Sequence, residues 1–173
     1  MKSRKKLFLL GIINALLFTV LLLIQYSTVI SIKILTANPM LPLTLLVAIA
    51  MFSSELTACL TGLFVGMFVD SVASTPSGFN SIIFFILAFA VSLTVRYLFN
   101  NNIRSGLALC FLSSAIYGLL RFVFCFAFSN SFSESLNYLL RYTLPSAVYT
   151  ALLIIPFYYL QRFLFEKLST QHY

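Results

Sequence analysis

Six long apolar stretches divided by short polar breaks constrain the fold of this chain more than any other feature. A helix that crosses a bilayer needs roughly 20 mostly apolar residues, and runs of this length recur along the whole chain. The expected spans are 7–30, 41–52, 56–73, 81–99, 105–128 and 138–165. The sequence therefore predicts an all-α membrane protein with six transmembrane helices in one domain, 1–173, whose second helix is short.

Composition agrees with this class and argues against a soluble module. Of the 173 residues, 61% are hydrophobic and only 9% are charged. The net charge of +7 comes from basic residues spread over the predicted helix ends, so it does not indicate a nucleic-acid surface. These basic residues instead indicate topology. The positive-inside rule favours two cytoplasmic termini, with Lys2, Arg4, Lys5, Lys6, Arg96, Arg104, Arg162 and Lys167 inside against Lys33 and Arg141 outside.

The residue types needed for enzymatic chemistry are scarce. The only histidine is His172, and the four acidic residues are scattered over different expected membrane depths. The three cysteines lie in apolar runs, which is typical of packing residues. We therefore expect a protein that is not an enzyme, with no catalytic, cofactor-binding or metal-binding residues.

Small residues recur at four-residue intervals along the third expected span. Ala58, Gly62 and Gly66 share one slowly coiling face of a helix, and Asp70 continues the series. Small residues at this spacing let another helix approach closely, which is how transmembrane helices associate when lipid removes the hydrophobic driving force. The stripe predicts a helix-packing seam within the bundle or, alternatively, an interface with a partner.

Asp70 is the carboxylate that most needs an explanation, because a charge inside the bilayer costs about 2.5 to 3.5 kcal/mol even on insertion scales. The expected location is the outer end of the third span. One interpretation is a structural cap that accepts hydrogen bonds from backbone amides of the turn 74–78; a substrate or ion site and a polar contact with a partner are the alternatives. Arg121, expected at comparable depth in the fifth span, is the candidate counter-ion.

The centre of the chain resembles the rod shape-determining MreD family. The run "GLFVGMFVD" has the family's two glycines and aspartate at four-residue spacing, and the resemblance covers about a third of the chain. It depends on Pro39, Gly62, Gly66, Asp70, Gly78 and Arg96. Relatives commonly carry an acidic residue after the proline, whereas this chain has Met40, so no role of that acid transfers.

The resemblance implies a non-enzymatic scaffold in the bacterial cytoplasmic (inner) membrane. MreD-like proteins bind the bitopic protein MreC and help to couple MreB filaments to RodA and its transpeptidase, the wall synthases of the elongasome. The implied role is therefore in cell shape and peptidoglycan synthesis. An MreC-like helix is expected against the small-residue stripe or against the outer face of the bundle.

A rival interpretation comes from a different class of protein. The substrate-binding components of energy-coupling factor vitamin transporters are similar six-helix proteins of comparable size. They dock on a coupling partner through small residues on the first helix, and Gly11 and Ala15 have the required spacing here. The motif from Gly62 to Asp70 favours the MreD-like interpretation.

Overall fold

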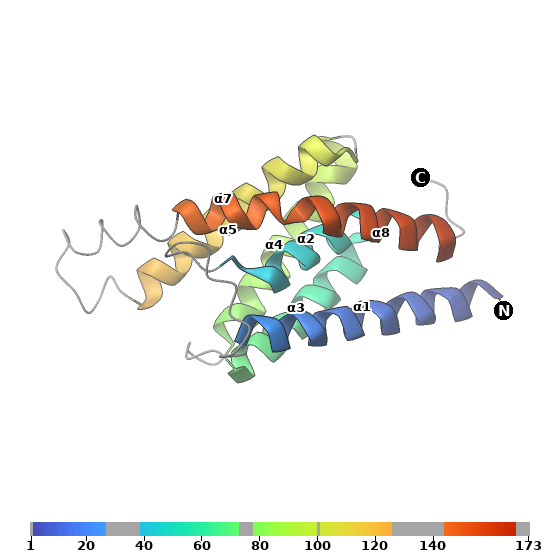
Figure 1. Cartoon of the computed structure of the whole chain (residues 1–173), viewed down its shortest axis with the longest axis horizontal. Helices are drawn as coiled ribbons and strands as arrows, with labels where there is room; N and C mark the ends of the chain where they lie inside the picture. Colours follow the sequence, from blue (N-terminus) through green and yellow to red (C-terminus); the bar gives the residue numbers. More distant parts are fainter. Residues whose placement is uncertain (1, 27–38, 73–77, 100, 126–143, 169–173) are drawn as a thin grey trace.

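The computed structural model describes residues 2–26, 39–72, 78–99, 101–125 and 144–168, which form helices and turns without a strand (Figure 1). Within these residues, five segments are long and apolar enough to cross a membrane, and a sixth apolar helix is shorter. The predicted all-α membrane fold is confirmed. The helices are α1 (Lys2–Tyr26), α2 (Leu41–Phe52), α3 (Glu55–Val72), α4 (Phe79–Tyr97), α5 (Ile103–Cys125), α7 (Leu144–Leu152) and α8 (Ile154–Leu168).

The predicted spans agree with these helices to within a few residues at most ends. The largest difference is at the start of α1, which begins at Lys2 and so includes the basic residues expected to precede it. Parts of four expected spans, 27–30, Ala73, 126–128 and 138–143, lie outside the described residues, as do Lys33 and Arg141. The expected membrane orientation stays a prediction.

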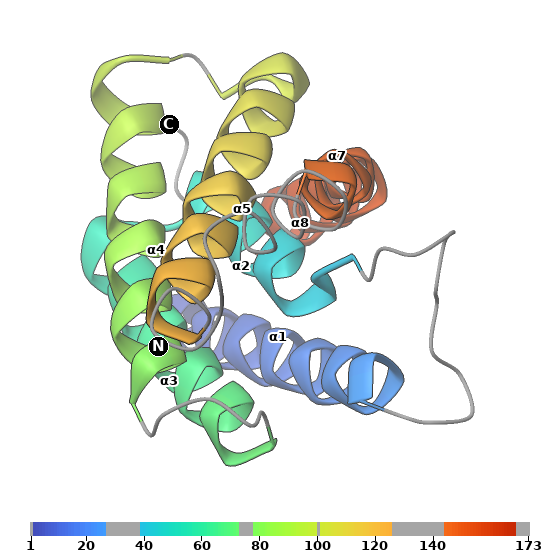
Figure 2. The ribbon, with the colours of Figure 1, turned by 90° about the vertical axis from the view of Figure 1, so that its left-hand side faces the viewer.

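The short helix α2 is the centre of the bundle. Every residue from Leu41 to Met51 is buried, and α2 contacts each of the other described helices (Figure 2). Its 12 residues span about 18 Å at 1.5 Å per residue, well short of the roughly 30 Å hydrocarbon core. This run of leucine, valine and alanine makes the helix apolar on all sides, which favours a position surrounded by other helices.

Both ends of α2 are closed by side chains from distant parts of the chain. The backbone N–H of Met40 donates to Oγ1 of Thr150 over 3.1 Å, and that of Leu41 donates to Oε1 of Gln25 over 3.1 Å. At the other end, Nδ2 of Asn101 donates to the carbonyl of Met51 over 3.1 Å. Because orphan amides and carbonyls at helix ends are costly away from water, these contacts allow α2 to end inside the bundle.

The last predicted helix is interrupted. A turn at Leu153 separates α7 from α8, while the two together still form one candidate span, Pro145–Lys167. Pro156 explains the break, because its ring clashes with the carbonyl of Leu152 four residues earlier and it has no N–H to donate.

The N-terminal helix packs beside the C-terminal one. α1 and α8 run antiparallel, so that the start of α1 and the end of α8 lie at the same end of the molecule (Figure 1). Nε2 of Gln161, which is 1% exposed, donates to Oδ1 of Asn14 over 2.8 Å. This buried contact joins residues 147 positions apart in the sequence and closes the bundle.

Candidate functional site: the α3–α4 clasp

The small-residue stripe is the surface on which α3 packs against α4. Ala58 is fully buried. A Cβ added at Gly62 would lie 2.5 Å from the carbonyl oxygen of Phe84, and one added at Gly66 would lie 2.3 Å from Cα of Ser81. Both contacts are with backbone, which a side-chain rotation cannot relieve. The stripe is therefore filled by α4, and the outer face of the bundle is the expected partner surface that stays open.

Asp70 joins α3 to the first turn of α4 through four hydrogen bonds. Oδ1 accepts from the backbone N–H of Asn80 at 3.0 Å and from its Nδ2 at 2.9 Å. Oδ2 accepts from the backbone N–H of Ser81 at 3.0 Å and from its Oγ at 2.6 Å. Asn80 and Ser81 are the second and third residues of α4, so this carboxylate performs the work of an N-cap from a neighbouring helix.

Asp70 caps a helix, as one interpretation of the sequence expected, and its described donors are on α4. The amides of residues 74–77, which were the expected donors together with that of Gly78, lie outside the described residues. Gly78 occupies the N-cap position and has no side chain to cap the helix. Its φ of 87° is in the left-handed region that favours glycine, while a Cβ there would meet nothing within 4 Å. Backbone conformation, rather than close packing, accounts for glycine at this position.

The polar contacts of Asp70 extend to a third helix. Oδ1 of Asn80, which is fully buried, accepts from the hydroxyl of Tyr117 on α5 over 2.8 Å. The Tyr117 ring also packs against Phe84 with ring centroids 5.5 Å apart. Sequence reasoning missed Asn80, Ser81 and Tyr117. The available signal was the pair of polar residues Asn80 and Ser81, which begins two positions after Gly78, in the first turn of the expected helix.

Arg121 does not pair with Asp70, contrary to the expectation. Within the described residues no ion pair joins them, and the side chain of Arg121 is exposed. The physical reason is that both oxygens of the carboxylate already accept two hydrogen bonds each. Arg121 lies near the end of its candidate span at Phe124, where a long basic side chain reaches the membrane surface.

The opposite end of the same helix pair is held by an ion pair. Nη1 of Arg96, in the last turn of α4, lies 2.6 Å from Oε1 of Glu55 in the first turn of α3. Beside it, Oγ of Ser92 donates to the carbonyl of Ser53 over 3.1 Å. We call the α3–α4 pair with the contacts of Glu55, Gly62, Gly66 and Asp70 the α3–α4 clasp. It is polar at both ends and tightly packed between them.

The described contacts of the clasp join α3 to α4. Within the described ranges there is no group of three or more histidine, cysteine or acidic residues that would hold a metal ion. Cys59 and Cys110 are buried free thiols. Each oxygen of the Asp70 carboxylate accepts two hydrogen bonds from this chain, which favours the structural cap over a substrate site.

Comparisons with family models, with curated proteins and with solved structures returned no match.

Proposed function

We propose that this chain is a non-enzymatic scaffold of the bacterial elongation complex, similar to MreD. It would bind an MreC-like bitopic protein in the cytoplasmic membrane and help to couple MreB filaments to RodA and its transpeptidase. The observation that carries the proposal concerns four residues on which the resemblance depends. Gly62, Gly66 and Asp70 belong to the α3–α4 clasp, and Gly78 is the N-cap residue of α4. A motif that packs two helices tightly together suits a protein that acts by binding partners rather than by catalysis.

The arrangement of the ends supports a role that connects cytoplasmic and membrane components. The start of α1 and the end of α8 lie at one end of the molecule (Figure 1). The sequence places basic residues at both of these positions. The positive-inside rule then assigns this end to the cytoplasm, where MreB filaments are found.

The outer face of the clasp is the surface we propose for the partner helix. The exposed apolar side chains of α3 include Leu56, Leu60 and Met67, and those of α4 include Ile82 and Ile86. The same clasp that buries the glycines turns these side chains outward. A partner helix could pack on them without opening the bundle.

A depletion experiment with microscopy tests the function. Rounded cells after depletion, restored by the wild-type chain, are expected. Unchanged cell shape would refute the scaffold proposal. For the partner surface, a photo-crosslinking residue at Leu60 should capture the MreC-like protein, whereas one at Leu152, on the distant α7 and of similar exposure, should not. Capture from Leu152 alone would move the interface to the other side of the bundle.

One observation favours the transporter component as the second candidate. Gly11 and Ala15 are exposed on α1 at four-residue spacing, and a Cβ at Gly11 would meet nothing within 4 Å. A coupling subunit could approach the bundle there. Loss of vitamin uptake with unchanged cell shape on depletion would select this function over the scaffold.

A further inference from the structure

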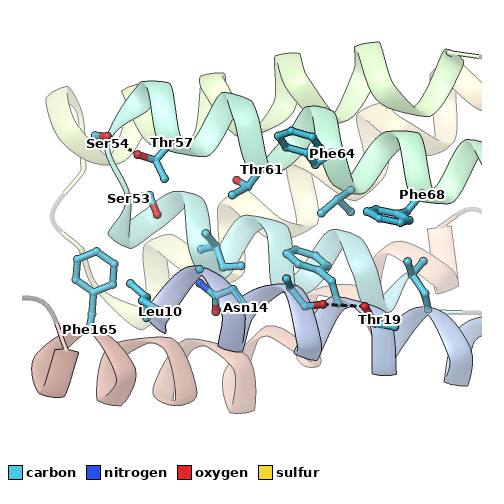
Figure 3. Close-up of a pocket in the computed structure, with 16 residues that line it drawn as sticks. Leu10, Asn14, Thr19, Ser53, Ser54, Thr57, Thr61, Phe64, Phe68 and Phe165 are labelled. Atoms are coloured by element: carbon cyan, nitrogen blue, oxygen red, sulfur yellow. Dashed lines mark hydrogen bonds between the residues drawn. The ribbon is translucent and has the colours of Figure 1, made fainter. Parts of the chain in front are cut away.

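A groove of about 470 Å³ runs between α1 and α3, on the side of α3 away from the clasp (Figure 3). We call it the α1–α3 groove. Its walls include Leu10, Asn14 and Phe18 on α1 and Thr57, Thr61 and Phe68 on α3. On α1 the lining extends from Leu10 to Leu22, a length of about 18 Å at 1.5 Å per residue. This length is close to the thickness of a single leaflet, about half of the roughly 30 Å hydrocarbon core.

The groove begins where the candidate membrane spans of α1 and α3 begin. The candidate span of α1 starts at Leu9, one residue before the lining does, and that of α3 starts at Glu55. Figure 3 shows Ser53, Ser54 and Thr57 toward the end with Leu10, beside Phe165, and Phe64 and Phe68 toward the other end, which also has Thr19. The hydroxyl of Thr19 donates within its own helix to Ala15. The three hydroxyl groups at the first end suit the polar ester region of a phospholipid, and Phe64 and Phe68 suit its acyl chain.

Asn14 supplies a hydrogen-bond donor inside the groove. Its side chain is only 9% exposed. The carboxamide oxygen accepts from Gln161, while the amide nitrogen points toward α2 and α3 and has no hydrogen-bond partner among the described residues (Figure 3). An unsatisfied buried N–H is costly, so an acceptor from beyond the described residues is expected, and a bound lipid can supply one. Ester carbonyl oxygens accept hydrogen bonds and donate none, which fits this site.

The shape of the groove favours an acyl chain over a transmembrane helix. A helix is a cylinder about 10 to 12 Å wide, which could rest on the opening of the groove. A flexible acyl chain can follow the length of the groove and reach Asn14, which is only 9% exposed.

The basic sequence that precedes the groove on α1 favours an anionic headgroup. Lys2, Arg4, Lys5 and Lys6 occupy the first turns of α1, directly before the groove begins at Leu10. Basic residues beside a membrane surface attract anionic lipids. We propose that the α1–α3 groove binds one anionic phospholipid, with its headgroup near the start of α1, an ester carbonyl on Asn14 and an acyl chain between Phe18, Phe64 and Phe68.

Native mass spectrometry of the full chain in mild detergent tests this proposal with two probes, phosphatidylglycerol and phosphatidylcholine of identical acyl chains. The wild type should retain one phosphatidylglycerol, with an affinity at least about thirtyfold above that for phosphatidylcholine. Changing Lys5→Gln and Lys6→Gln together should weaken phosphatidylglycerol binding about thirtyfold, at roughly fivefold per charge, and leave phosphatidylcholine unchanged.

The variant Gly11→Phe should abolish lipid retention by filling the groove, and it should fold because a Cβ at Gly11 meets nothing within 4 Å. Its matched control is Ile12→Phe, on an exposed neighbouring position that does not line the groove, which should bind as the wild type does. Asn14→Leu should weaken both lipids equally.

Three outcomes would overturn the proposal. The first is equal affinity for the two lipids. The second is that Gly11→Phe retains lipid while its circular dichroism is normal. The third is a dimer or a co-purified protein that Gly11→Phe removes while lipid binding persists. The last would assign the groove to a second copy or to a partner helix.

Discussion

Removing the Asp70 carboxylate should destabilise the fold through the first turn of α4. In Asp70→Ala, two backbone amides and two side-chain donors lose their acceptor together. Loss of an N-cap costs about 0.5 to 2 kcal/mol, and polar groups left unsatisfied in a buried site cost about 1 to 3 kcal/mol. The two costs describe the same hydrogen bonds, so they cannot be added in full. We therefore expect a loss of about 2 to 4 kcal/mol in the free energy of unfolding.

The conservative variant separates the hydrogen bonds from the volume of the side chain. Asp70→Asn retains an oxygen for Asn80 and places an NH₂ group opposite the donors of Ser81. The Ser81 hydroxyl can rotate to accept, so the backbone N–H of Ser81 is the main group left unpaired. We expect a loss of about 1 to 2 kcal/mol, smaller than that of Asp70→Ala.

The assay is reversible unfolding of the full chain in mixed micelles, followed by far-ultraviolet circular dichroism, with midpoint and slope fitted together. The matched control is Ser71→Ala, the next residue, whose hydroxyl donates within its own helix to Phe68; its stability should stay within about 0.5 kcal/mol of the wild type. If Asp70→Ala also stayed within that margin, the capping argument would be refuted.

A double-mutant cycle tests whether Arg121 contributes to the site. Since no ion pair joins Arg121 to Asp70 in the described structure, the losses from Arg121→Leu and Asp70→Asn should add within about 0.5 kcal/mol. A coupling energy above about 1 kcal/mol would show that Arg121 and Asp70 interact, and it would contradict the geometry of the described residues.

Three further predictions follow from the packing, with the same unfolding assay. Gly66→Ala should lower the free energy of unfolding by about 2 kcal/mol or more, because its Cβ would meet the α4 backbone. Gly11→Ala should be neutral or stabilising by up to about 1 kcal/mol. Equal effects of the two substitutions would contradict the close packing of α3 against α4 at Gly66. Gly78→Ala should cost about 1 kcal/mol through its positive φ alone, and Gly78→Asn less, so a larger loss for Asn would count against that reason. Gln161→Leu should cost about 1 to 3 kcal/mol, and adding Asn14→Leu should recover part of it, since replacing both partners of a buried hydrogen bond leaves nothing unpaired.

The sequence predicted the helices well because, in a membrane, helix formation depends on residues that are close together in the sequence. Each span must satisfy its own backbone hydrogen bonds and present about 20 apolar residues to lipid, and both demands can be read from a window of sequence. The bounds of α2 agree with the prediction at both ends. The break at Leu153 was missed, although Pro156 carried the signal, because proline is tolerated within many transmembrane helices.

The sequence also selected the residues of the clasp, but not their partners. Spacing alone put Gly62, Gly66 and Asp70 on one face of α3. It did not identify α4 as the helix that fills this face, nor the choice of Asn80 and Ser81 over Arg121. Those outcomes depend on the crossing and register of two helices, which no local pattern specifies.

The sequence by itself determined that this chain forms apolar helices, that one of them is short and that a carboxylate ends the small-residue stripe. Only the tertiary structure decided that the short helix is the centre of the bundle, that the stripe is closed by α4 and that a groove remains beside α1. The physical reason is the distance along the sequence over which each interaction acts. Hydropathy and backbone hydrogen bonding act within one helix, whereas burial in a bundle is set by contacts between residues as far apart as Asn14 and Gln161.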